Sequence, residues 1–294
     1  MTITAEQVRE LRERTGAGMM ECKKALVAAG GSIDAAIDAM RKSGTAKADK
    51  KAGRVAAEGA VIAKTSHDHH TGVIVEINCE TDFVGRDDNF KHFAERVAEV
   101  ALASKLSDVA VLSAQPIEPN SATTIEQARA ALIAKVGENV QIRRVELFTT
   151  DGKLVSYIHG GRIGVMVQLT GGDIQLGRDL AMHIAANNPL VVSSDKVPAE
   201  LVNKEKEIFS AQAATSGKPP AIIEKMVEGR IKKFLDEVSL LGQPFVKNPD
   251  ISVAQLLKQN NAQVQHFVRF AVGEGIEKQT ENFAEAVMAQ VRGG

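Results

Sequence analysis

The spacing of the apolar residues changes between two periods along the chain, and this change limits the folds available to it. Up to about residue 42, and again over 90–101, apolar residues recur every three or four positions, as on one face of a helix. From Ala56, and again from Val140, they alternate with other residues, as on strands. Helical and alternating stretches that occupy separate parts of the chain predict an α+β fold, with antiparallel sheets covered by helices.

The first 42 residues predict a small bundle of three helices. Thr4 and Ser32 can cap the first and third helices, and Gly16 and the pair Gly30-Gly31 can end the first and second. Residues 43–55 are rich in Ala and Lys, a composition that predicts a solvated, partly helical linker.

Residues 56–139 and 140–278 predict two related subdomains. In each, a strand is followed by an amphipathic helix. The strand at 72–78 precedes the helix at 90–103 in the first subdomain, and the strand at 164–169 precedes the helix at 176–186 in the second. An exposed loop is predicted at 114–124, where Pro, Asn and Ser gather.

A helical hairpin is predicted within the second subdomain, between about Val197 and Leu241. Its turn is Ser216-Gly-Lys-Pro-Pro220, and its second arm carries the seam of a coiled coil, namely Ile223, Val227, Ile231, Phe234, Val238 and Leu241. A homodimer through this hairpin is one alternative that the pattern leaves open. Strand alternation returns at 263–272, and a last helix at about 280–291 predicts a C-terminal helical module over 279–294.

Charge and composition argue against several classes of function. With 36 Lys and Arg against 37 Asp and Glu, the net charge is −1, so no overall basic field would attract nucleic acid or an anionic membrane. Residues 1–20 lack the apolar core of a signal peptide, so a cytoplasmic protein is expected. Cys22 and Cys79 are isolated in apolar surroundings, which favours reduced core thiols over a disulfide or a metal site.

No enzyme signature occurs in the sequence. Phosphate-loop, dinucleotide, nucleophile-elbow and metalloprotease patterns are missing, and at Gly217-Lys218-Pro219 a proline replaces the hydroxyl residue that would hold magnesium. His67, His69 and His70 lie in a turn without a further ligand at a suitable spacing, so a polar turn is favoured over a metal site. Neither a catalytic residue nor a cofactor is therefore expected.

Thr81-Asp82-Phe83-Val84 follows directly on a predicted strand and places a large aromatic residue beside an acid in a loop. One interpretation is that Phe83 folds back into its own core, while Asp82 begins the turn or caps the next helix. Composition favours it, because buried Phe is common. The other is that Phe83 enters a partner.

The segment Glu10-Leu-Arg-Glu-Arg-Thr-Gly-Ala-Gly-Met-Met-Glu-Cys-Lys-Lys-Ala-Leu26 and the run Gly72-Val-Ile-Val-Glu-Ile-Asn-Cys-Glu80, followed by Thr81 to Val84, resemble the bacterial elongation factor Ts family. The resemblance spans nearly the whole chain. It implies a module like the ubiquitin-associated fold at the N-terminus, and guanine-nucleotide exchange on the GTPase elongation factor Tu without covalent chemistry.

The resemblance also implies roles for single residues. In this family the motif matched by Thr81, Asp82, Phe83 and Val84 reaches the partner near its magnesium ion and phosphates. Lys23, His159 and Val246 match further partner contacts. The alternatives are an exposed helical lysine, a turn histidine and simple packing.

Two rival functions remain open from the residues themselves. One is a structural adaptor that binds through the three-helix module and assembles through the hairpin. The other is an RNA-binding protein that uses the basic residues of the linker, namely Lys42, Lys47, Lys50, Lys51 and Arg54. The near-zero net charge argues against RNA binding.

Overall fold

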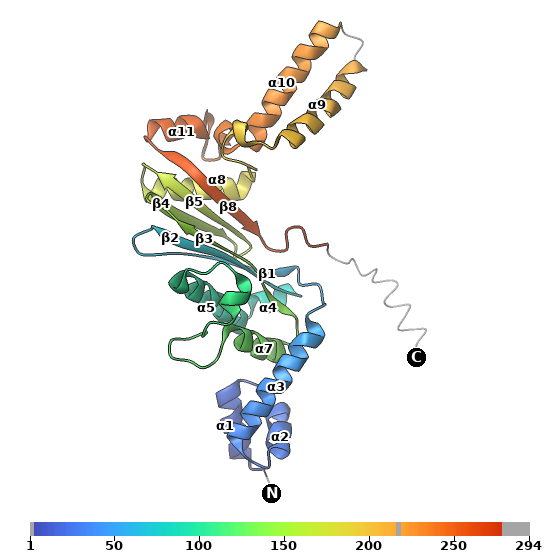
Figure 1. Ribbon diagram of the computed structural model, residues 1–294, viewed down its shortest axis with the longest axis vertical. Coiled ribbons are helices and arrows are strands. Elements are labelled where there is room, and N and C mark those ends of the chain that lie inside the picture. The colour runs from blue at the N-terminus through green and yellow to red at the C-terminus, as the bar shows by residue number, and fades with distance from the viewer. Residues whose placement is uncertain (1–2, 216–218, 278–294) are drawn as a thin grey trace. The chain divides into compact units, whose positions relative to one another are not determined.

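The computed structural model describes residues 3–215 and 219–277 (Figure 1). The chain forms two compact units. Unit 1 comprises Met1–Ile62, Val75–Val145 and Ala271–Gly294, and unit 2 comprises Ala63–Ile74 and Glu146–Phe270. Both units combine helices with small sheets, which confirms the α+β prediction. The predicted C-terminal helix and module lie outside the described residues, as does most of the predicted turn at 216–220.

Unit 1 begins with the three predicted helices, α1 (Ala5–Thr15), α2 (Met19–Ala28) and α3 (Ile33–Lys51). Thr4 caps α1 in a capping box with Gln7, and Gly16 ends it in the left-handed conformation. The helices share a small apolar core formed by Val8, Leu11, Cys22, Leu26 and Ala36.

Helix α3 continues without a break to Lys51, in line with the prediction of a partly helical linker. The first part of the expected linker is thus regular helix and is not fully solvated. Gly44 and Ala48 are buried one turn apart, on a helix that packs against α7 (Ile125–Val136). Small side chains at this spacing let two helices approach closely. The local composition of residues 43–55 does not reveal this contact, because α7 lies far along the chain.

Strands β1 (Glu58–Thr65), β2 (Thr71–Cys79) and β3 (Val140–Thr149) form one sheet in that order. The chain between β2 and β3 forms α4 (Asp82–Arg86), α5 (Asp88–Ser104), α6 (Val109–Ser113) and α7. The predicted stripe of α5 is buried at Phe90, Phe93, Val97 and Ala101. Helices α6 and α7 were not predicted.

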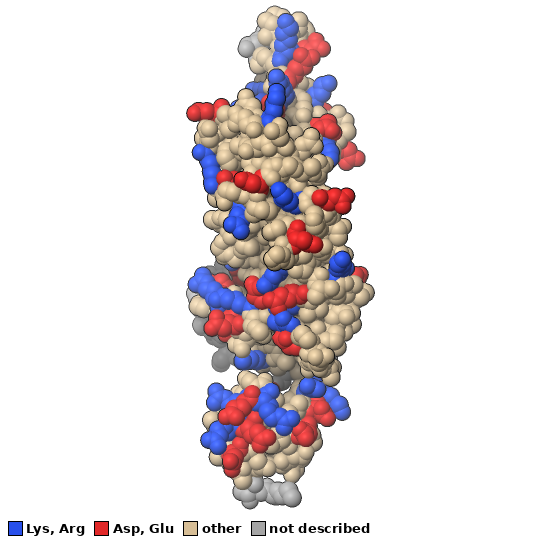
Figure 2. All heavy atoms as spheres, turned by 90° about the vertical axis from the view of Figure 1, so that its left-hand side faces the viewer, with Lys and Arg blue, Asp and Glu red and all other residues tan. Residues whose placement is uncertain are grey.

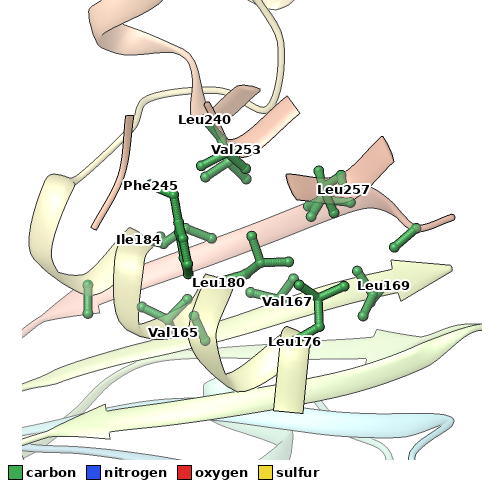
Figure 3. Packing of buried hydrophobic residues seen from close by; sticks show 14 residues of the cluster. Val165, Val167, Leu169, Leu176, Leu180, Ile184, Leu240, Phe245, Val253 and Leu257 are labelled. Carbon is green, nitrogen blue, oxygen red and sulfur yellow. The ribbon is translucent and has the colours of Figure 1, made fainter. Parts of the chain in front are cut away.

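The second sheet belongs to unit 2, in the order β4 (Lys153–His159), β5 (Ile163–Thr170) and β8 (Gln263–Ala271). β4 and β5 are antiparallel, with Tyr157 opposite Val165. Helix α8 (Ile174–Asn187) packs on both strands. Its inner face meets Val165, Val167 and Leu169 in an apolar cluster of unit 2, which Leu240, Phe245, Val253 and Leu257 close from the other side (Figure 3).

Short elements complete the cover of this core. They are the 3-10 turns η1 (Ser194–Lys196) and η2 (Leu240–Gly242), the strands β6 (Pro244–Phe245) and β7 (Asn248–Ser252), and helix α11 (Val253–Gln259). β6 and β7 form a separate antiparallel pair.

The predicted helical hairpin is present as α9 (Ala199–Ala214) and α10 (Pro220–Val238), which pack along each other. Along the predicted seam Val227 is buried and the other residues are half-buried. Across the pair, the Arg230 guanidinium lies 5.7 Å from the centre of the Phe209 ring and donates to Gln212 Oε1 at 2.7 Å. These contacts join α9 and α10 within a single chain.

Over the described residues on the face shown in Figure 2, basic and acidic side chains are interspersed, in line with the net charge of −1. None of the described helices is long and apolar enough to cross a membrane.

Candidate functional site

Thr81 to Val84 form the cap and first turn of helix α4, and not the loop that the sequence predicts. Thr81 is extended, and its Oγ1 accepts the Val84 N–H at 3.4 Å. A threonine hydroxyl at this position satisfies a backbone N–H that has no partner inside the helix. The cap thus starts a short helix directly after β2.

Phe83 is 80% exposed, although Val84 beside it is buried. Successive residues of a helical turn point about 100° apart, so anchoring Val84 in the core directs Phe83 outward. The interpretation that Phe83 packs into its own core is therefore wrong. An exposed aromatic ring on a fixed turn is instead available to another molecule.

Asp82 pairs with Arg86 one turn later, with 2.8 Å between Oδ2 and Nη2, and both side chains are substantially exposed. Such pairs contribute about 0.3 to 0.5 kcal/mol, so this one orients the carboxylate more than it stabilises the fold. Asp82 does not cap the following helix, as one interpretation held. Asp87 caps α5, since its Oδ1 accepts the N–H groups of Asn89 and Phe90.

The turn between α7 and β3 forms hydrogen bonds with the motif. The Glu138 carboxylate accepts the Thr81 N–H at 2.9 Å and the Thr81 hydroxyl at 2.6 Å. At the neighbouring positions, one residue after Glu138 and one residue before Thr81, the Asn139 N–H donates to Glu80 Oε1 at 2.6 Å. Sequence reasoning missed Glu138, whose only local signal is a polar Gly-Glu-Asn run between a helix and a strand.

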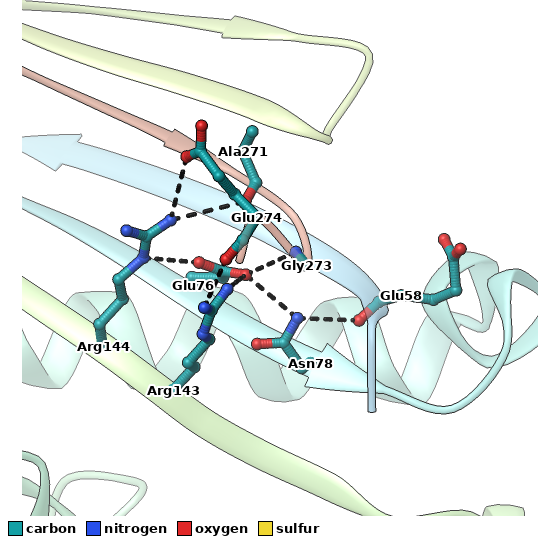
Figure 4. Close-up of polar contacts among 8 residues, drawn as sticks. All are labelled: Glu58, Glu76, Asn78, Arg143, Arg144, Ala271, Gly273 and Glu274. Carbon is teal, nitrogen blue, oxygen red and sulfur yellow. Dashed lines mark hydrogen bonds and ion pairs between the residues drawn. The ribbon is translucent and has the colours of Figure 1, made fainter. Parts of the chain in front are cut away.

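A buried carboxylate on β2 lies a few residues before the motif (Figure 4). Glu76 is fully buried and accepts from Arg143 at 2.9 Å, Arg144 at 2.6 Å, the Gly273 N–H at 2.8 Å and Asn78 at 3.1 Å. Burial alone would raise the pKa of Glu76, but these hydrogen bonds and the charge of Arg144 outweigh it, so the pKa lies below its ordinary value. All of these residues belong to unit 1.

Lys23 is exposed on α2, in the same unit as the motif. Met19, Met20 and Val27 around it are 59%, 64% and 62% exposed. Met19, Lys23 and Val27 follow each other at intervals of four and share one helix face. Lys23 therefore lies on a largely apolar exposed face and not on a purely charged one.

His159 ends β4 in unit 2 and is exposed. Its Nδ1 lies 3.0 Å from the hydroxyl of Tyr157, two residues earlier on the same face of the strand. Tyr157 packs against the apolar cluster of unit 2, so it anchors the imidazole at the end of the strand.

Val246 is 41% exposed, and the backbone around it is fixed by a buried histidine. The Val246 N–H donates to His183 Nδ1 at 3.1 Å, and His183 Nε2 lies 2.9 Å from Gln243 Oε1. Because Nδ1 accepts, the proton of the neutral ring sits on Nε2 and is donated to Gln243. Burial lowers the pKa of His183, which keeps this ring neutral.

The predicted site residues thus fall into separate groups. Thr81 to Val84 share one turn of unit 1, Lys23 lies on another element of that unit, and His159 and Val246 lie on different elements of unit 2. Among the described residues, no group of three His, Cys, Asp or Glu side chains is arranged to hold a metal ion.

Comparison with known proteins decides the family. A family model described as "Elongation factor TS" matches residues 80–274. The Elongation factor Ts of Thioalkalivibrio sulfidiphilus (strain HL-EbGR7) is 61% identical over 100% of both chains. The chain belongs to the elongation factor Ts family. Proteins with the same name from Methylococcus capsulatus and Legionella pneumophila are each 59% identical over 99% of both chains.

The elongation factor Ts match includes most of the site described above. The family model begins at Glu80, one residue before the motif, and includes Glu138, His159 and Val246. Lys23 lies outside that range, but the elongation factor Ts relatives cover it because they align over the full chain or nearly so.

Proposed function

We propose that this chain is a guanine-nucleotide exchange factor for elongation factor Tu and acts in translation elongation in the cytoplasm. The observation that carries the proposal is the exposure of Phe83 on a fixed turn of a chain that belongs to the elongation factor Ts family. The nucleotide is held by the partner, and the chain itself supplies binding energy without covalent chemistry.

The physical basis is a wedge beside a metal ion. A phosphate-bound magnesium ion requires near-ideal octahedral geometry, so small displacements of the surrounding partner loops weaken it steeply. Burying one Phe side chain in a partner pocket contributes about 1.5 to 3 kcal/mol, which corresponds to a change in affinity of roughly 10-fold to 100-fold. Phe83 reaches such a pocket without first breaking contacts of its own.

Exchange then follows from thermodynamic linkage. A factor that binds the empty GTPase more tightly than the loaded one weakens nucleotide binding by the same ratio. Nucleotide entering the complex displaces the factor in turn. Specificity for guanine remains a property of the partner.

The other predicted contacts extend this interface. We assign three further contact points to the partner: Lys23 with its exposed apolar neighbours on α2, His159, and Val246. All three residues are exposed, and the His159 side chain and the Val246 backbone are held by hydrogen bonds. Asp82 lies beside the wedge, where its carboxylate can either hold the displaced partner segment by hydrogen bonds or repel the acidic ligands of the metal.

The test is release of a fluorescent GDP analogue from purified elongation factor Tu, with unlabelled nucleotide in excess and the chain in catalytic amounts. Wild type should accelerate release, and Phe83→Ala should lower the catalytic efficiency of that acceleration roughly 10-fold to 100-fold. Val111→Ala is the matched control, since Val111 is also exposed and apolar in unit 1 but lies on α6.

Asp82→Asn and Asp82→Ala separate the two roles of the carboxylate, because Asn can still form hydrogen bonds but carries no charge. If Phe83→Ala and Asp82→Ala both accelerate GDP release from elongation factor Tu as much as wild type does, while both still bind this partner, the proposal is wrong. Partner binding by wild type without faster release would favour the adaptor.

A further inference from the structure

We propose that Glu138 is the positioning residue of the Phe83 turn, and that it acts on nucleotide exchange only through Thr81. The inference rests on the proposed function. Glu138 lies 57 residues from Thr81 in the chain, yet its two carboxylate oxygens accept both polar hydrogens of that residue, from the backbone N–H at 2.9 Å and from the hydroxyl at 2.6 Å.

The double contact fixes the direction of the Thr81 side chain. The hydroxyl proton points to Glu138, which leaves a lone pair of Oγ1 for the Val84 N–H. Glu138 therefore orients the Thr81 hydroxyl, and the oriented hydroxyl caps the first turn of α4. Hydrogen bonds to an ionised carboxylate are shorter and about twice as strong as neutral ones, so this contact dominates the cap.

Phe83 depends on this anchoring because its own side chain has almost no packing. At 80% exposure, its direction is set by the backbone between Thr81 and Val84. Val84 anchors one side by burial, and Thr81 anchors the other through Glu138. Without the second anchor the turn could pivot about Val84, and the ring would sample positions that no longer match one pocket.

The base of the anchor is itself fixed. Glu80 accepts the Asn139 N–H, so the two segments are joined at two successive residues. The Asn139 side-chain amide donates to the carbonyl oxygens of Ala52 at 3.3 Å and Arg54 at 2.9 Å, directly after α3. Lys51, at the end of α3, donates to the Gly137 carbonyl oxygen. The segment that carries Glu138 is therefore hydrogen-bonded to the end of α3, the last helix of the N-terminal three-helix module, and to the residues directly after it.

The experiment is a cycle of four proteins in the GDP-release assay, namely wild type, Glu138→Gln, Phe83→Ala and the double variant. Glutamine has nearly the same shape, but it is uncharged and replaces one of the two accepting oxygens by an NH2 group, which cannot accept from Thr81. We expect Glu138→Gln to lower stimulated release about 10-fold in the wild-type background and to have no further effect in the Phe83→Ala background. A residue with only a general structural role would not show this dependence on Phe83.

Two controls accompany the cycle. Glu126→Gln removes a carboxylate of the same unit that pairs with Arg129, and release should stay at the wild-type rate. Thr81→Val removes the hydroxyl and should reproduce part of the Glu138→Gln loss. Urea midpoints identify any variant that fails to fold.

The outcomes separate this inference from the proposed function. Losses that multiply in the double variant, or a Glu138→Gln variant with wild-type release, would overturn the role of Glu138 while leaving exchange activity in place. If wild type itself fails to accelerate release, the proposed function fails. Hydrogen exchange at the Thr81 amide still tests the geometry then, because it should become faster in Glu138→Gln and unchanged protection would contradict the contact.

Discussion

A single glycine closes the buried charge cluster of unit 1. Gly273 has a φ of +73°, donates its N–H to Glu76, and would place a Cβ atom 2.2 Å from the carbonyl oxygen of Ala57. Gly273→Ala combines left-handed strain with a clash against backbone, so it should lower the free energy of unfolding of unit 1 by about 2 to 4 kcal/mol. Urea unfolding, followed by circular dichroism, measures the loss.

Gly275→Ala is the matched control for this prediction. Gly275 has a φ of +76°, but its added Cβ would meet only Arg143 Nη2, at 3.9 Å. The substitution should cost about 1 to 2 kcal/mol from backbone strain alone. Equal losses in the two variants would show that the clash and the Glu76 contact do not matter.

The residues of the site could be predicted from the sequence only where they carry a local signal. The motif around Phe83 stands out because an aromatic residue follows a strand and precedes a helix. Composition alone favoured burial of Phe83 and only the family resemblance predicted its exposure, because the deciding fact is that Val84 occupies the core instead. Glu138 carries no such signal, because its partner Thr81 lies 57 residues away.

At the scale of elements, the hydrophobic period predicted the strands of the two three-stranded sheets, the amphipathic helices α5 and α8 and the helical hairpin, but not β6 and β7. It failed for α7, where alanines occupy much of the helix and blur the apolar stripe, although Thr124 and Gln127 form a capping box at its start. Helix α11 has seven residues, too few for the helical period to emerge, and it too begins with a capping box, Ser252 with Gln255. Attention to caps would have found both helices.

Two helical glycines show how packing decides the effect of one substitution. In α8, a Cβ on Gly177 would lie 2.5 Å from Val155 Cγ2 and 2.9 Å from its Cβ, so Gly177→Ala should destabilise unit 2 by about 1 to 3 kcal/mol. In α10, nothing lies within 4 Å of the Cβ position of Gly229, so Gly229→Ala should stabilise that helix by about 0.5 to 1 kcal/mol.

Amide hydrogen exchange in α8 and α10 measures both changes locally. Protection should fall around residue 177 in the first variant and rise around residue 229 in the second. A loss of protection in α10 on Gly229→Ala would mean that the hairpin requires the flexibility of glycine, contrary to its open surroundings.

At the scale of the whole molecule, the described part of each unit contains a buried side chain whose pKa is lowered by its surroundings. In unit 2, burial lowers the pKa of His183 from its ordinary value of 6.5. In unit 1, hydrogen bonds and the charge of Arg144 lower the pKa of Glu76 from its ordinary value of 4.5 despite burial. Protonation of either group therefore favours the unfolded chain, but in different ranges of pH.

The two units should accordingly lose stability at different pH values as the solution is acidified, unit 2 before unit 1. Below about pH 6.5 the unfolded chain binds a proton at His183 that the folded chain refuses, so unit 2 loses up to about 1.4 kcal/mol per pH unit. The contribution of Glu76 persists until the pH falls below about 4.5, because only then does the unfolded carboxylate take up its proton. Between these values the pH weakens unit 2 through His183 and spares the Glu76 cluster of unit 1.

Hydrogen exchange at pH 7.5 and 5.5, corrected for intrinsic rates, tests this order. Peptides from α8 and residues 240–246 should lose protection at pH 5.5, while peptides from residues 75–79 and 140–145 should keep it. His183→Gln provides the control, because a glutamine can accept from the Val246 N–H and donate to Gln243 without titrating in this range. The pH dependence of unit 2 should therefore flatten in that variant, and an unchanged dependence would assign the effect to a group other than His183.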